Sequence, residues 1–500
     1  MVLHLPIAIW LDRFSIPQLN SMSEQPQHYP ISRRNALRQM ACGFGYMAAA
    51  GISSQQAMAS SIANPLLPRT PHLFPRAKRV IFLFMAGGVS QVDSYDYKPL
   101  LYKKDGDMLD FTDQRILAKT GMGSNQRVMK PLWDFKQHGQ NGAWVSDLFP
   151  HMAKHTDDYC VIRSMHTEGV AHGPATLFLH TGSTNLIRPS MGSWVSYGLG
   201  TESQDMPGFV SLSPSFGNGG PRNYGNAFLP AAYQGTAMGR AGMEATNIGI
   251  DNLRNDSLSP DRQKRQFELL QSMNHEQCQS QPGNSELEAV ISSYELAWRM
   301  QSNAPEVMDI SKESAATKEL YGIGEKHTDN YGRQCLMARR MAESGVRFIQ
   351  VNYSDNSNNP AWDQHNDMPK HKEHALAVDK PVAGLLTDLK KRGLLEDTLV
   401  WWGGEFGRTP YAQKNGTGRD HNPTGFSVWL AGGGVKPGLI HGATDEWGQY
   451  AIENKVHMHD LHATILYLLG MDHEKLTFRH EGRDYRLTDV HGNVIHDIIA

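Results

Sequence analysis

Acidic residues and histidines recur directly after apolar runs of this sequence, in short segments otherwise rich in glycine and small polar residues. The segments are 87–96 (GGVSQVDSYD), 362–367 (WDQHND), 403–408 (GGEFGR) and 418–423 (GRDHNP). Mixed carboxylate and imidazole groups are typical of sites for zinc, manganese, iron or calcium. The sequence therefore predicts a divalent-metal site with these candidate ligands: Asp93, Asp96, Asp363, His365, Glu405, Asp420 and His421.

Each of these residues also has a simpler interpretation when it is taken alone. Asp93 would cap a following helix, Glu405 would pair with Arg408, and His421 would hydrogen-bond within its own loop. Their shared position after apolar runs is the stronger observation, because a metal needs several ligands in one place. The lack of cysteine in these segments disfavours a closed structural zinc site.

Another candidate lies upstream, in the segment 163–182 (RSMHTEGVAHGPATLFLHTG). His172 precedes Gly173 and Pro174 at a predicted helix start, where backbone N–H groups and the helix dipole favour an anion. The alternative is that Pro174 only begins a helix that packs through its leucines. Both interpretations are compatible with a functional His172.

Three arginines are candidates for binding an oxyanion, because a guanidinium can offer two parallel hydrogen bonds to sulfate or phosphate. They are Arg347, Arg408 and Arg419. A role in surface solubility is the alternative for each. Arg408 directly follows a predicted strand end, so it is the best placed of the three.

The elements that must position these residues form an alternating pattern. Apolar runs at 79–88, 345–355, 397–408 and 425–434 are typical of buried strands. Helical patterns precede two of them, at 333–344 and 374–393, and a final helix is predicted at 457–470 with Gly470 at its end. We expect an α/β fold with a doubly wound, mostly parallel sheet, helices on both faces and ligands at the carboxyl ends of the strands.

The 500 residues are predicted to contain one large domain, at 76–500, preceded by a linker at 61–75. Within the domain, residues 200–345 form a loop-rich and then helical elaboration of the same sheet. A net charge of −3 gives no reason to expect nucleic acid as a partner. Cys160, Cys278 and Cys335 are too few and too widely spaced for a disulfide framework, so we expect small buried side chains, with one bridge plus a free thiol as the alternative.

Residues 1–60 are predicted to be a twin-arginine signal peptide. The segment contains paired Arg33 and Arg34, an apolar stretch at 40–52 and a small-x-small site at 57–59. The apolar stretch is shorter than the ~18 to 20 residues that span a bilayer, so no permanent membrane anchor is expected. A basic leader without structure is the alternative. The signal predicts a periplasmic or secreted protein.

Four segments, at 80–99, 403–410, 418–448 and 460–492, resemble the sulfatase-like secreted proteins of domain-of-unknown-function family 1501. This family is placed in the alkaline phosphatase and sulfatase superfamily, and the resemblance covers nearly everything after residue 75. It implies an alkaline phosphatase-like fold, a metal site at the strand ends, and hydrolysis of sulfate or phosphate esters through a covalent intermediate.

Carried over residue by residue, the resemblance places Asp363 and His365 where the phosphatases have an aspartate and a histidine after a middle strand. Glu405 takes the place of the acidic residue in the next strand-end motif. His421 resembles the histidine shortly before the last sheet strand.

The chain also departs from the superfamily pattern. Residues 86–88 replace the usual aspartate after the first strand, so Asp93 or Asp96 would have to reach back. His172 falls on the place of the sulfatase nucleophile, which excludes formylglycine chemistry there. The alternatives are that His172 is a nucleophile or a metal ligand, that catalysis is lost, or that another side chain attacks: Ser90, Ser164 or Thr167.

Two functions remain open from the sequence. The first is a secreted, metal-dependent hydrolase of sulfate or phosphate esters, acting on a sulfated or phosphorylated small molecule or polysaccharide with zinc, calcium or manganese. The second is a non-catalytic sulfatase-like binding or accessory protein for anionic glycans, which the missing aspartate and nucleophile motif favour. A metal enzyme with different chemistry is a third reading, because one fold hosts many reactions.

Overall fold

The computed structural model describes residues 65–111, 125–249, 258–281, 284–355, 357, 359–413 and 416–500. The chain divides into two units, Met1–Ser60 and Ser61–Ala500. The predicted signal peptide lies outside the described residues and stays a prediction. Among the residues that are described, no helix is both long enough and apolar enough to cross a membrane.

A nine-stranded sheet forms the centre of the described unit. Neighbouring strands pair in parallel on both sides of β1, whereas β13 runs antiparallel to both of its neighbours. The predicted mostly parallel α/β sheet is therefore confirmed. In spatial order the strands are β14 (Ile440–His441), β6 (Tyr159–His166), β13 (Phe426–Ala431), β10 (Thr398–Gly403), β1 (Arg79–Met85), β9 (Phe348–Tyr353), β7 (Phe209–Leu212) and β8 (Thr236–Met238), and β17 (Val456–His457) pairs with β6.

The sheet is covered by helices on both faces, which explains why its central strands read as continuous apolar runs. All residues of β1 and β10 are buried. Alternate β1 side chains point to opposite faces: Ile81 and Leu83 pack with α10 (Asp329–Glu343) and α11 (His371–Lys391). On the other face, Phe82 and Phe84 pack with α5 (His172–Thr181), α6 (Met191–Leu199) and α12 (Met458–Leu468).

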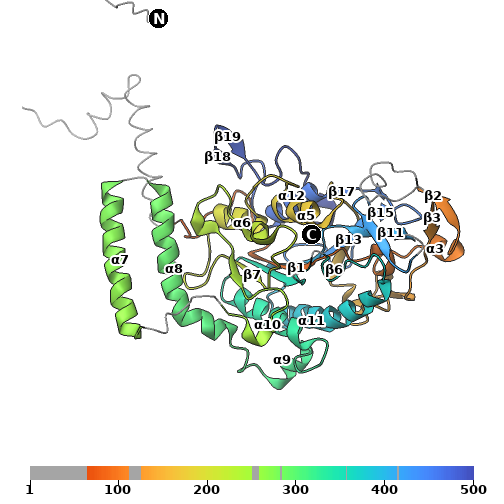
Figure 1. Ribbon diagram of the computed structural model, residues 1–500, viewed down its shortest axis with the longest axis horizontal. Coiled ribbons are helices and arrows are strands. Elements are labelled where there is room, and N and C mark those ends of the chain that lie inside the picture. The colour runs from red at the N-terminus through yellow and green to blue at the C-terminus, as the bar shows by residue number, and fades with distance from the viewer. Residues whose placement is uncertain are drawn as a thin grey trace, which may run out of the picture. The chain divides into compact units, whose positions relative to one another are not determined.

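The elaboration at 200–345 adds to this sheet at one edge. Strands β7 and β8 continue it in parallel beyond β9. Its helices are α7 (Pro260–Ser280), α8 (Ser285–Met308), α9 (Ala315–Leu320) and α10. Figure 1 shows α7 and α8 side by side. The ring of Phe267 in α7 stacks on that of Trp298 in α8. The described cysteines are all free: Cys160 and Cys335 are buried and Cys278 is half-buried.

A second, four-stranded sheet was not predicted, and two of its strands, β11 and β12, follow β10 directly. It orders β12 (Arg419–Asn422), β11 (Gly407–Ala412), β3 (Asn125–Val128) and β2 (Met108–Asp110). Residues expected in strand-end loops therefore lie in the β11–β12 hairpin. The smaller elements are α3 (Pro99–Lys103) and three strand pairs, β4 (Phe135–His138) with β5 (Ala143–Ser146), β15 (Ala443–Thr444) with β16 (Ala451–Glu453), and β18 (Phe478–His480) with β19 (Arg483–Tyr485).

Candidate metal centre

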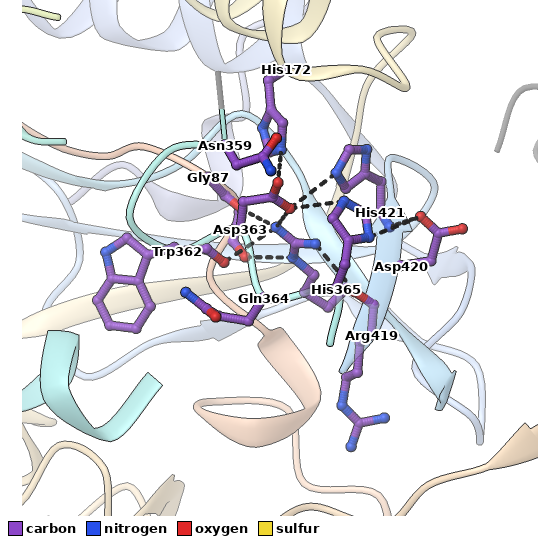
Figure 2. Close-up of polar contacts among 12 residues, drawn as sticks. Gly87, His172, Asn359, Trp362, Asp363, Gln364, His365, Arg419, Asp420 and His421 are labelled. Carbon is purple, nitrogen blue, oxygen red and sulfur yellow. Dashed lines mark hydrogen bonds and ion pairs between the residues drawn. The ribbon is translucent and has the colours of Figure 1, made fainter. Parts of the chain in front are cut away.

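Four side chains converge at the carboxyl edge of the central sheet. His172, Asp363, His365 and His421 each offer one ligand atom, and these atoms all lie within 4.8 Å of one another. Figure 2 shows the Asp363 carboxylate in the middle of the three imidazole rings. The Asp363 side chain is 1% exposed and that of His365 is 26% exposed, so solvent reaches the cluster on the His365 side.

Three separate parts of the fold supply these residues. His172 is the first residue of α5, which follows the carboxyl end of β6. Asp363 and His365 lie in the loop after β9, and His421 lies in β12. The carboxyl ends of β6 and β9 reach the same edge of the sheet because these strands run in the same direction.

A close backbone contact holds the Asp363 loop against the end of β1. The Trp362 N–H donates to the Ala86 carbonyl at 3.1 Å, and the Trp362 side chain is fully buried. Gly87 has φ +114°, and a Cβ atom there would lie 2.6 Å from the Asp363 nitrogen. Only glycine allows this approach, so the glycine at position 87 has a structural reason.

The Nε2 atoms of the three histidines all face the Asp363 carboxylate. The distances are 3.1 Å from His172 to Oδ2, 2.9 Å from His365 to Oδ1 and 3.3 Å from His421 to Oδ1. The Nδ1 atom of each ring is held by a different acceptor. The acceptors are Glu405 Oε1 for His172 at 2.7 Å, Gln413 Oε1 for His365, and the Val170 carbonyl for His421 at 2.7 Å.

This arrangement fits a cation. An acceptor at Nδ1 fixes the tautomer with the proton on Nδ1, so each Nε2 presents a lone pair. Lone pairs and a carboxylate that face one another repel unless a positive charge lies among them. His172 Nε2 and Asp363 Oδ2 are both buried without a hydrogen-bond partner, as expected for metal ligands.

The electrostatics of the cluster agree with this interpretation. Burial alone would raise the pKa of Asp363, but the three adjacent histidines and the Arg408 guanidinium hold it far below its ordinary value. Burial lowers the pKa of His421 to about 4, so this ring is neutral at pH 7 and able to bind a metal. Burial would also lower the pKa of His172, but Asp363 and Glu405 outweigh it and raise that pKa. The two carboxylates therefore attract positive charge to this place.

Arg408 supports the cluster from beneath. Its guanidinium lies 2.8 Å from Asp363 Oδ1 and is fully buried. It also donates hydrogen bonds to backbone carbonyls. These carbonyls belong to Gly87, Gly88, Trp362 and Arg419. The structure places Arg408 at the predicted site, where it is fully buried and orients Asp363.

Several predicted site residues lie together but outside the cluster. Asp93 pairs with Arg419 at 2.7 Å, and the Ser90 hydroxyl donates to the same carboxylate. Arg419 also donates to the carbonyls of Thr409, Met129 and Lys130. Asp96 pairs with Lys98 at 3.1 Å and accepts from the Thr444 hydroxyl. The structure does not bring these residues to the four ligands. The carboxylates of Asp93 and Asp96 are instead paired with the buried side chains of Arg419 and Lys98.

The remaining predicted residues divide between the cluster and the opposite edge. Glu405 contacts His172 and not the other three ligands. Asp420 Oδ1 lies 3.7 Å from His365 Nδ1 and accepts from the His421 N–H. Arg347 lies just before β9, at the amino edge of the sheet, and its guanidinium donates to the carbonyls of Gly200 and Lys78. The distance of Arg347 from the cluster follows from its position before the strand rather than after it.

Sequence reasoning missed two of the three groups that hold the histidine rings. Val170 acts through its carbonyl, which no side-chain pattern indicates. Gln413 directly follows β11, in the β11–β12 hairpin. The sequence predicted loops after strands for the residues of this hairpin. The glycine pair at 87–88 can be seen in the sequence. The role of Gly87 is to let the backbone of the Asp363 loop pack closely against it, and this contact appears only in the structure.

The fold and the donor set define an α/β protein with a candidate metal centre at the carboxyl edge of its sheet. The chain belongs to the DUF1501 family, described as "Protein of unknown function (DUF1501)", whose model matches residues 77–499. The suspected family is thereby confirmed. A search of curated proteins found no significant match.

Solved structures with some likeness include the PsFucS1 sulfatase from Pseudoalteromonas sp., 12% identical over 86% of this chain and 73% of that chain, with a TM-score of 0.35. The lipoteichoic acid synthase LtaP from Listeria monocytogenes is 9% identical over 86% and 80%, with a TM-score of 0.34. A mutant of TAB5 alkaline phosphatase with bound Mg is 12% identical over 79% and 99%, with a TM-score of 0.31. At these values the likeness carries no argument about activity.

Proposed function

We propose that this protein is a metal-dependent hydrolase of sulfate or phosphate esters, exported to the periplasm or beyond. The observation that carries the proposal is the convergence of three histidine Nε2 atoms on the buried Asp363 carboxylate. Three nitrogen donors and one oxygen donor suit zinc, manganese or iron better than calcium, which prefers oxygen ligands throughout. A bound divalent metal would polarise the ester oxygen and lower the pKa of the attacking group.

The attacking group is inferred to be a water molecule. In the part of the chain that the structure describes, none of the hydroxyls of Ser90, Ser164 and Thr167 contacts the four ligands; Ser164 donates instead to the Asn454 carbonyl at 2.6 Å. His172 has its Nδ1 atom engaged by Glu405 and its Nε2 atom in the cluster, which supports a role as a ligand rather than as a nucleophile. The water oxygen would bond to sulfur or phosphorus as the bond to the ester oxygen breaks. The proton lost by the water would pass to that leaving oxygen, which gives the alcohol and inorganic sulfate or phosphate.

A second function has its own supporting observation. Arg408 and Arg419 are fully buried and hydrogen-bonded to internal groups, so neither guanidinium is exposed to a substrate oxyanion. A non-catalytic protein that binds an anionic glycan through the metal alone would need neither an arginine nor a nucleophile. The two proposals differ in whether the metal-loaded protein turns over an ester.

One experiment separates these outcomes. The mature protein is purified, its metal content is measured, and hydrolysis of aryl sulfates and aryl phosphates is assayed. Asp363→Ala and His365→Ala are the test variants. Asp367→Ala is the matched control, because this half-exposed carboxylate lies in the same loop outside the cluster. Bound metal with hydrolysis that both test variants lose supports the hydrolase. Bound metal without hydrolysis supports the binding protein, and no metal in the wild type contradicts both.

Export is tested separately. Replacing Arg33 and Arg34 by lysine is expected to keep the precursor in the cytoplasm, because the paired arginines are the signal for the twin-arginine route. Cell fractionation gives the answer. Unchanged export of the doubly substituted precursor would contradict the predicted signal peptide.

A further inference from the structure

The helix α7 packs along α8 but buries none of its side chains. Figure 1 shows α7 on the outer side of α8. A helix of a globular protein is normally stabilised by burying an apolar face against other elements. Within the single chain, α7 therefore has little of the packing that a helix of its length requires.

The side of α7 that faces α8 is mainly polar. The Gln271 side-chain amide donates to the Glu295 carboxylate at 2.8 Å, and the Asn274 amide donates to Gln271 at 3.2 Å. The ring of Phe267 adds the aromatic contact with Trp298. The other large apolar residues of α7 take no part in this polar contact.

Those apolar residues form a stripe on another side of the helix. Leu269, Leu270 and Met273 are 64%, 40% and 60% exposed. Residues at positions i, i+1 and i+4 share one side of an α-helix, so the three side chains are contiguous. An exposed apolar surface of this kind marks a contact with another molecule. These three residues are called the α7 stripe below.

The charges beside the α7 stripe suit an antiparallel copy of the same helix. Arg265 and Glu276 are exposed and lie about three turns apart, so they share one flank of α7. About 16 Å of helix separates them, which is too far for an ion pair within one helix. In the described part of the chain neither forms an ion pair, whereas Lys264 pairs with Glu268 at 3.9 Å.

A two-fold axis through the middle of the α7 stripe would bring these charges together. With two antiparallel helices centred on Gln271, Leu269 lies opposite Met273 of the second copy. Arg265 then lies beside Glu276 of the second copy, and the axis repeats both contacts in reverse. Ion pairs that flank an apolar seam set the orientation of paired helices. The α7 stripe and its flank are therefore complementary to themselves.

A membrane surface suits α7 less well. Helices that lie on membranes have a polar face rich in lysine and arginine. In α7 the basic residues are balanced by as many acidic ones: Arg262, Lys264 and Arg265 against Asp261, Glu268 and Glu276. The neutral helix has no strong attraction to anionic lipid.

We propose that the α7 stripe is a dimerisation surface, on which α7 of a second copy of this chain packs in the antiparallel direction. The proposal concerns the α7–α8 hairpin and depends neither on the metal nor on the proposed hydrolase function.

The test measures association of the purified protein by sedimentation velocity over a dilution series. Leu270→Glu and Met273→Glu place a charge in the apolar seam, so both variants should be monomeric. Leu376→Glu, at a 47% exposed position in α11, is the matched control and should dimerise as the wild type does. All three positions are exposed in the single chain, so the fold should be retained.

Charge reversal tests the orientation of the two helices. Arg265→Glu and Glu276→Arg should each raise the Kd of the dimer about tenfold, because each places like charges together twice. The double variant should restore the wild-type Kd, since both pairs form again with their signs exchanged. Lys264→Glu is the control and should dimerise normally, because Lys264 lies about two and a half turns from Met273, on the far side of α7.

The other outcomes would contradict the proposal. A wild type that stays monomeric, or a dimer that the stripe variants do not weaken, would overturn it. Loss of the dimer in the stripe variants without rescue by the double charge reversal would overturn the antiparallel pairing. A monomer that binds phosphatidylglycerol vesicles, and loses this binding in Leu270→Glu, would assign the α7 stripe to a membrane surface instead.

Discussion

The Nδ1 atom of His172 lies 2.7 Å from Oε1 of Glu405, and the same carboxylate accepts the Gly87 N–H at 3.0 and 3.1 Å. One side chain thus fixes both the ring of a metal ligand and the backbone that supports Asp363. Carboxylate partners of this kind set the tautomer of a ligating histidine and increase its basicity.

Replacing Glu405 by glutamine therefore has a defined expected effect. Glu405→Gln should weaken metal binding by about 10- to 100-fold, because a neutral partner no longer stabilises the ligating form of His172. Metal titration followed by calorimetry measures the change. Glu453→Gln, at an exposed position in β16, is the matched control. Equal affinities for the two variants would contradict the positioning role of Glu405.

Gly87 offers a second prediction, with Gly106 as its control. Both glycines have positive φ, but a Cβ at Gly106 would have open space, whereas one at Gly87 would lie under 3 Å from three backbone atoms of the Asp363 loop. Gly87→Ala should lower the free energy of unfolding by roughly 1–3 kcal/mol more than Gly106→Ala and should abolish metal binding. Urea unfolding and metal content give both readouts. Intact metal binding in Gly87→Ala would show that the loop is not seated as described.

Arg408 is predicted to act through stability rather than substrate binding. Arg408→Met leaves the buried Asp363 carboxylate and several carbonyls without a donor, which should cost about 3–5 kcal/mol in the free energy of unfolding. The exposed Arg479→Met should cost less than ~1 kcal/mol. Wild-type stability in Arg408→Met, combined with a raised KM, would identify Arg408 as a substrate-binding residue instead.

Chelation should destabilise the wild type. A metal that binds only the folded chain adds about 2.7 kcal/mol at a free concentration 100 times its Kd. We expect EDTA to lower the Tm of the wild type and to leave the Tm of His172→Ala unchanged, because that variant lacks a ligand. Differential scanning calorimetry with and without EDTA provides the measurement. The same EDTA shift in both proteins would exclude His172 from the ligand set.

Stability should also fall on acidification, through histidines outside the metal cluster. His462 in α12 is fully buried, and its Nε2–H donates to the Leu179 carbonyl at 2.8 Å. Burial lowers its pKa to about 4, against about 6.5 in the unfolded chain. Between these values the unfolded state binds a proton that the folded state does not, so stability is complete above pH 6.5 and declines as the pH falls toward 4.

The contribution of His462 over this window is roughly 3 kcal/mol. Chemical unfolding at pH 7 and pH 4.5 should therefore show a smaller loss of stability in His462→Gln than in the wild type. His275→Gln, at an exposed position in α7, should lose as much as the wild type. Identical losses in all three proteins would assign the acid sensitivity to other groups.

Residue type and placement in the sequence were enough to predict the sheet and part of the cluster. Asp363, His365 and His421 all follow apolar runs, and parallel strands bring their carboxyl ends to one edge. Asp93 and Asp96 have the same signature, yet they pair with Arg419 and Lys98. No local pattern separates the two groups, because Arg419, the partner of Asp93, lies 326 residues further along the chain.

The sequence by itself determined the alternation of strands and helices, the family, and the types of residue that could bind a metal, because hydrophobic periodicity and short motifs are local properties. Only the tertiary structure decided that His172 lies with the other candidate ligands, that Glu405 contacts it, and that Arg408 and Arg419 make internal contacts. The physical reason is that hydrogen bonds and charges act over a few ångströms in space. Those distances are set by the packing of the β11–β12 hairpin, α5 and the Asp363 loop against the sheet.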